Sequence, residues 1–138
     1  MFPDPDDSST LYAFYTSMEE DNGKEEQSLA ISHDGGDTFV EYAGNPLIDV
    51  SSKSFRDPKV IYWKDTFVMT VARPDKSKIE FYTTKDPKQW SAKPSGEFLM
   101  KNSTKGAWEH PDLFEMPIAN SANATAWVLL VSVRGVGV

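Results

Sequence analysis

The sequence has no cysteine among its 138 residues and only two histidines, His33 and His110. A disulfide framework and a thiolate metal site are therefore excluded, and two histidines cannot supply an all-histidine zinc site. We expect neither a metal nor a cofactor. No apolar run approaches the length of about 18 residues that a membrane-spanning helix needs, so we expect no membrane partner.

Positive charge is also scarce, because 14 Lys and Arg stand against 21 Asp and Glu and leave a net charge of −7. Nucleic-acid binding needs clustered basic side chains that replace the counterions of the phosphates. No such cluster occurs, and we expect no nucleic-acid partner. The acidic segment Met1–Asp7 lacks the basic-then-apolar pattern of a signal peptide, so the chain as written shows no export signal.

What the sequence does contain is a series of short β-branched and aromatic runs separated by turn residues. Asn22-Gly23 predicts a charged hairpin tip over 19–26, and Asp34-Gly35-Gly36-Asp37 predicts a tight turn. No segment has a convincing helical pattern. The predicted strands cover residues 11–17, 27–32, 38–42, 59–63, 67–72, 79–84 and 127–133.

Two features recur at a spacing near 50. Asp34 and Asp86 follow similar strands and lie 52 positions apart, while Asp57 and His110 each precede a proline and lie 53 apart. This period, with about four strands in each unit, is typical of β-propeller blades. We therefore predict an all-β fold with about two blades of antiparallel four-stranded sheet, residues 1–138 forming part of a single domain that begins and ends inside a blade. A β-sandwich remains the alternative, since its strands are also evenly spaced.

The recurring prolines lie in two strings, 54–60 (SFRDPKV) and 108–114 (WEHPDLF), that each place a carboxylate at the start of an apolar run. Two carboxylates held apart by a rigid scaffold are the minimum equipment for cleaving a glycosidic bond. Arg56 and Asp57 would bind sugar hydroxyls through a guanidinium fork and a carboxylate. The alternative is a strand-entry turn with a surface ion pair.

Glu109 lies between Trp108 and His110-Pro111. A carboxyl group beside an indole loses hydration, which favours the protonated form that a general acid needs. The alternative is a solvent-facing glutamate at a strand start. We expect Trp108 to contact the sugar, and the other three tryptophans, Trp63, Trp90 and Trp127, to lie in the core of the blades.

The strings 55–60 and 108–114 resemble glycoside hydrolase family 32, which includes invertases, inulinases and levanases. The stretch 31–42, followed by 45–47, resembles the segment that precedes the Arg-Asp-Pro motif in that family. The similarity extends over nearly the whole chain. It implies a five-bladed propeller and retaining cleavage of the fructosyl bond of sucrose or a fructan, without a cofactor. It also implies that the full-length parent protein is extracellular.

By this resemblance Glu109 is the acid/base catalyst, Asp57 is the transition-state stabiliser, and Arg56 and Trp108 bind substrate. The family's nucleophile, an aspartate in a Trp-x-Asn-Asp-Pro-Asn-Gly motif, is absent from this chain, because Asp4-Pro5-Asp6 lacks the flanking residues. Without a nucleophile a retaining mechanism has no first step, so we expect no turnover by these residues alone.

His110 occupies the position at which the family usually has cysteine after the acid/base residue. An imidazolium there would favour the ionised form of Glu109 and weaken it as an acid. Three alternatives to a fructosidase stay open from the sequence: a non-catalytic carbohydrate-binding relative, an inactive remnant, and a propeller glycosidase acting on arabinan or xylan. The sequence also holds two possible glycosylation triplets, at Asn102 and Asn123.

Overall fold

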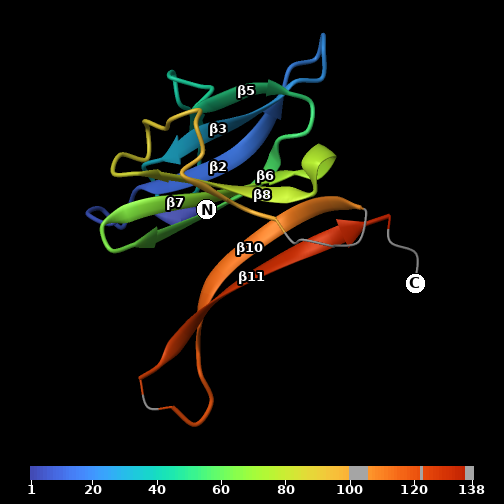
Figure 1. Cartoon of the computed structure of the whole chain (residues 1–138). Coiled ribbons are helices and arrows are strands. Elements are labelled where there is room, and N and C mark those ends of the chain that lie inside the picture. The colour runs from blue at the N-terminus through green and yellow to red at the C-terminus, as the bar shows by residue number, and fades with distance from the viewer. Residues whose placement is uncertain (100–105, 122, 136–138) are drawn as a thin grey trace.

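The computed structural model describes residues 1–99, 106–121 and 123–135 and consists of antiparallel strands (Figure 1). The only helical element in these ranges is the single 3₁₀ turn Pro74–Lys76, and none of their elements is an apolar helix of membrane-spanning length. The all-β prediction is confirmed. The strands are β1 (Phe2–Pro3), β2 (Leu11–Met18), β3 (Glu25–Ser32), β4 (Val40–Glu41), β5 (Ile48–Ser52), β6 (Arg56–Trp63), β7 (Thr66–Arg73), β8 (Lys78–Thr84), β9 (Gly96–Phe98), β10 (Ala107–Pro117) and β11 (Thr125–Arg134).

The strands form three sheets that follow one another along the chain. The first has the order β1-β2-β3-β4, with β5 also paired to β3. The second has the order β6-β7-β8-β9, and the third is the β10-β11 hairpin. In Figure 1 the second sheet lies between the other two, and the hairpin curves away beneath it. This succession of antiparallel sheets agrees with the predicted propeller blades, with two larger sheets followed by a two-stranded hairpin.

The core lies between the sheets because each presents an apolar face to the next. Leu29 and Ile48 from the first sheet and Met69 and Val71 from the second are 0–1% exposed and belong to one cluster. Phe55, in the short connection between these sheets, is 0% exposed in the same cluster. The connection is therefore fixed by its own side chain.

The predicted repeat is visible in local geometry. Ser32 Oγ accepts a hydrogen bond from the amide of Asp34 at 3.3 Å, and Thr84 Oγ1 accepts one from the amide of Asp86 at 3.2 Å. The same side-chain turn thus ends β3 in the first sheet and β8 in the second, each of which is the third strand in the order of its sheet. The predicted turn at Asp34 is confirmed, and its carboxylate also accepts the amide and hydroxyl of Thr38.

Several expectations need correction. The charged segment 19–26 is not entirely a hairpin tip, because strand β3 already begins at Glu25. Strands β5 and β9 were not predicted, since the first is largely polar and the second has three residues. The predicted strand 38–42 is reduced to the two residues of β4. The triplet at Asn102 lies outside the described residues.

Candidate functional site

The two recurring proline motifs adopt the same backbone geometry. Asp57 has φ +60° and His110 has φ +53°, a conformation that few non-glycine residues adopt. Both precede proline, and in both strands the pairing register shifts at this point, between Arg56 and Lys59 in β6 and across His110 in β10. Each bulge interrupts the alternation of side chains between the two faces of the strand. A positive φ at a residue other than glycine is a strained conformation, and such strain often marks a functional site.

These bulges are joined directly to one another. The main-chain N–H of His110 donates to Oδ2 of Asp57 at 2.9 Å. Arg56 donates through Nε and Nη2 to Oε1 of Glu109, at 3.3 and 3.2 Å. The structure therefore brings Arg56, Asp57 and Glu109 together from two successive sheets, although 53 positions separate them in the sequence.

An open depression of about 420 Å³ lies where the bulges meet. It is lined by residues 57–59 and 110–112, and Glu109 is not among the lining residues. The carboxylate of Asp57 thus has access to this depression, whereas that of Glu109 is turned toward the arginines. Among the described residues no cluster of three His, Asp or Glu side chains is arranged to hold a metal ion.

Glu109 has a different environment from the one its neighbour in sequence suggests. Its side chain is 13% exposed and contacts two guanidinium groups, Arg56 and Arg134, the latter at 3.3 Å. Trp108 points to the opposite face of β10, where it is 2% exposed and packs with Ala72 and Ile79. Two expectations are corrected here, because the indole neither borders the Glu109 carboxylate nor offers a free face to a sugar.

The other tryptophans also differ from expectation. Trp90 packs against the core as predicted. Trp63 and Trp127, by contrast, are each 42% exposed and meet edge to face with ring centroids 5.9 Å apart. They line an apolar groove between the second sheet and the hairpin, so these two predictions of core positions are wrong for the described residues.

His110 faces Asp57 rather than Glu109. Its side chain is 71% exposed, and Nδ1 lies 3.9 Å from Oδ2 of Asp57. The imidazole therefore lies beside the carboxylate of Asp57. The expectation that His110 acts on Glu109 finds no contact to support it.

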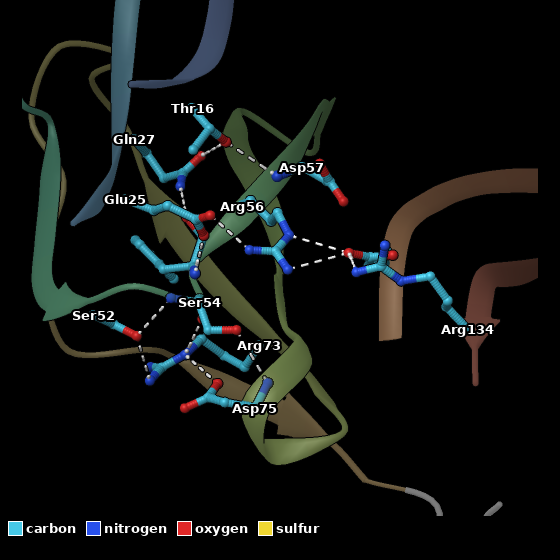
Figure 2. A network of polar contacts seen from close by, with 12 residues as sticks. Thr16, Glu25, Gln27, Ser52, Ser54, Arg56, Asp57, Arg73, Asp75 and Arg134 are labelled. Atoms are coloured by element: carbon cyan, nitrogen blue, oxygen red, sulfur yellow. Dashed lines mark hydrogen bonds and ion pairs between the residues drawn. The ribbon is translucent and has the colours of Figure 1, made fainter. Parts of the chain in front are cut away.

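Side chains from the first sheet hold the backbone of residues 55–57, as Figure 2 shows. Thr16 Oγ1 accepts the amide of Asp57 at 3.1 Å, and Gln27 Nε2 donates to the carbonyl of Phe55 at 2.7 Å. Glu25 accepts the amide of Phe55 through Oε2 at 2.7 Å and Arg56 Nη1 through Oε1 at 2.6 Å. Buried backbone groups need such partners, and here they come from another sheet.

These supporting residues were missed by the sequence reasoning. One available signal was polarity in a strand that is otherwise buried, because Gln27 is 0% exposed and the side chain of Glu25 is 12% exposed. Arg134 was also missed.

Burial lowers the pKa of the Arg56 guanidinium, but Glu25 and Glu109 outweigh this effect and raise it, so Arg56 stays charged.

A second network holds the connection just before the site. Arg73 Nε donates to the carbonyl of Ser54 at 3.0 Å, and Arg73 Nη1 pairs with Glu80 at 3.2 Å. Glu80 is 3% exposed and also accepts from Tyr82 and Lys78, at 2.7 and 2.9 Å. The second sheet thus fixes residue 54 while the first sheet fixes residues 55–57.

Comparison with known proteins gives a consistent picture. The chain is 43% identical to a levanase from Bacillus subtilis over 127 residues, which is 89% of this chain and 18% of the levanase. It is 36% identical to invertase 2 of Saccharomyces cerevisiae, covering 80% of this chain and 21% of the invertase. An extracellular exo-inulinase from Meyerozyma guilliermondii is 35% identical over 90% of this chain and 23% of that protein. The chain therefore spans about a fifth of the length of these relatives.

A solved structure is similar as well. A fructofuranosidase from Schwanniomyces occidentalis, determined in complex with fructose, superposes with a TM-score of 0.79 at 35% identity. The superposition covers 90% of this chain and 24% of that one. Residues 4–137 match the glycosyl hydrolases family 32 N-terminal domain. The chain belongs to glycoside hydrolase family 32, and its fold is part of that family's β-propeller.

Proposed function

We propose that residues 1–138 belong to the catalytic propeller domain of a retaining β-fructofuranosidase, which cleaves the fructosyl bond of sucrose or of a fructan. The observation that carries this proposal is the junction of the two bulges, where Asp57 and Glu109 are linked through Arg56 and the amide of His110. The relatives named levanase and invertase support the substrate class.

In this reaction Asp57 accepts hydrogen bonds from fructose hydroxyls in the open depression, which strengthen as the ring gains positive charge. Glu109 donates a proton to the leaving oxygen and later takes one from water. Its carboxylate pairs with Arg56 and Arg134, and Arg134, whose side chain is 73% exposed, has room to move aside when substrate enters.

A retaining reaction also needs a nucleophilic carboxylate about 5–5.5 Å from the acid. The 138 residues contain no Trp-x-Asn-Asp-Pro-Asn-Gly motif to supply it. We therefore expect this chain to bind fructose without releasing sugar from sucrose.

The test is a titration of the purified chain with fructose and with arabinose, followed by tryptophan fluorescence and by NMR, together with an assay for reducing sugar released from sucrose. Saturable binding of fructose that Asp57→Asn abolishes supports the proposal. Asp65→Asn, in the exposed turn after β6, is the matched control and should bind as the unchanged chain does. Absence of fructose binding, or preference for arabinose, would overturn the proposal.

A non-catalytic carbohydrate-binding relative, which would keep Asp57 and Arg56 as sugar contacts, is the second candidate. Both candidates bind fructose, so the discriminating observation is the gene sequence immediately upstream of Met1. An in-frame Asn-Asp-Pro-Asn there supports the enzyme, whereas a natural start without one supports the binding protein.

We also propose an extracellular site of action, supported by the extracellular exo-inulinase among the relatives. Detection of the protein in culture medium of the intact source organism checks this. Its retention inside the cells would contradict it.

A further inference from the structure

We propose that Glu25 is a positioning residue for the fructose site, one that fixes the guanidinium of Arg56 so that it bridges two sheets. The effect of Glu25 on sugar binding rests on the proposed function, whereas its effect on the orientation of Arg56 does not. Glu25 lies at the first position of β3, 31 positions before Arg56 in the sequence, and no motif marks it.

The first argument is geometric. The two oxygens of Glu25 have different tasks, because Oε1 accepts from Arg56 Nη1 at 2.6 Å and Oε2 accepts from the amide of Phe55 at 2.7 Å. One carboxylate thus holds a side chain and the adjoining backbone at the same time.

The second argument concerns the edges of the guanidinium. Arg56 presents Nη1 to Glu25, while Nε and Nη2 face Glu109. Figure 2 shows the planar group of Arg56 with Glu25 on one side of it. Because both edges are occupied, rotation of the group is slowed and its position relative to Asp57, the next residue, is restricted.

The third argument is electrostatic. Three carboxylates, those of Glu25, Asp57 and Glu109, share this region with the guanidinium groups of Arg56 and Arg134. Without Glu25 the full charge of Arg56 would act on Glu109 and Asp57 alone. Charge-assisted bonds of this kind are about twice as strong as neutral ones, so the orientation of Arg56 depends on both acids.

The substitution Glu25→Gln separates the two tasks, because glutamine keeps an oxygen for the amide of Phe55 but loses the charge that holds Arg56. Glu26→Gln is the matched control. Glu26 is the next residue of β3, is 8% exposed and pairs with Lys24 at 2.6 Å, so its loss also removes one buried charge from the strand, away from Arg56.

The first readout is rotation about the Nε–Cζ bond of Arg56, measured by NMR exchange between its Nη1 and Nη2 signals, which are assigned by their loss in Arg56→Lys. We expect rotation at least roughly tenfold faster in Glu25→Gln and within about twofold of the unchanged chain in Glu26→Gln. Rotation in Glu25→Gln that stays within twofold would overturn the inference.

The second readout is the dissociation constant for fructose, measured at a temperature at which each variant is fully folded. We expect Glu25→Gln to weaken binding roughly tenfold, which is the loss of one charge-assisted bond, and Glu26→Gln to leave it unchanged. Equal binding by Glu25→Gln and the unchanged chain would refute the role in sugar recognition. If the unchanged chain binds no fructose, the proposed function fails while the rotation measurement still decides the role of Glu25.

Discussion

The buried acid Glu80 offers the sharpest test of how the second sheet holds the site. Glu80 is 3% exposed, and its carboxylate accepts from Arg73, Lys78 and Tyr82. The change Glu80→Gln keeps the shape and one acceptor oxygen but removes the charge that faces Arg73. We expect a large loss of stability, because Arg73 is then a buried cation with a weakened set of partners.

The magnitude follows from the remaining contacts. Removing one partner of a buried ion pair costs about 3–5 kcal/mol, and Arg73 retains Asp75 at 3.6 Å, so the lower figure of about 3 kcal/mol applies. For a chain of this length each kcal/mol shifts Tm by about 3–5 °C, which gives a decrease of about 9–15 °C. Against a total stability of about 5–15 kcal/mol this is a severe change.

Thermal and urea unfolding followed by circular dichroism at pH 7 measure the effect. Glu97→Gln is the control, since Glu97 also pairs with Lys78 but has a side chain that is 45% exposed, and it should stay within about 0.5 kcal/mol of the unchanged chain. If Glu80→Gln melts within 2 °C, on the order of experimental error, the buried network does not stabilise the fold and the reasoning is wrong.

Three further predictions concern stability. Burial raises the pKa of the Glu80 carboxyl, but hydrogen bonds from its neighbours outweigh this effect and leave the pKa below the ordinary value of 4.5. The stability that ionised Glu80 contributes is therefore present above that pH and is lost as pH falls below it. Urea unfolding at pH 7 and pH 3 should show a smaller difference in unfolding free energy between Glu80→Gln and the unchanged chain in acid, and an equal difference at both pH values would contradict this. Trp108→Ala should cost about 3–5 kcal/mol by leaving a cavity, whereas Trp127→Ala should cost about 1 kcal/mol, and equal unfolding midpoints would refute the assigned burial. Asn45→Ala should cost about 2 kcal/mol, because the Asn45 amide bonds both the N–H and the C=O of Leu29 at 2.9 Å, and unchanged urea unfolding would show that water replaces it.

The sequence allowed the sheets to be predicted wherever strands were apolar and bounded by turn residues, as in β2, β7 and β8. It also identified the pair of carboxylates, because Asp57 and Glu109 lie in short motifs beside prolines. The orientation of Trp108 was predicted wrongly although alternation along a strand places neighbouring residues on opposite faces. Burial of Trp108 on one face of β10 and the contact of Glu109 with Arg56 on the other face follow from the same rule.

The support for the site could not be read from local sequence. Glu25 and Arg56 meet across 31 positions, and Thr16 and Asp57 across 41, so neither pairing leaves a short motif. Glu25 belongs to a run of acidic residues that is equally compatible with a solvated turn. Only the stacking of one sheet on the next determines that this acid, and not Glu20 or Glu26, reaches the arginine.

The connection between the first two sheets has a practical consequence for dividing the protein. The backbone of residues 54–57 takes its hydrogen bonds from side chains of both flanking sheets, so a new pair of chain ends placed there would disconnect Asp57 from its supports. The turn at residues 19–24 is closed by its own backbone and contacts the rest of the chain through Lys24 alone among the bonds described. Circular permutants and split-protein fragments should therefore be opened at that turn.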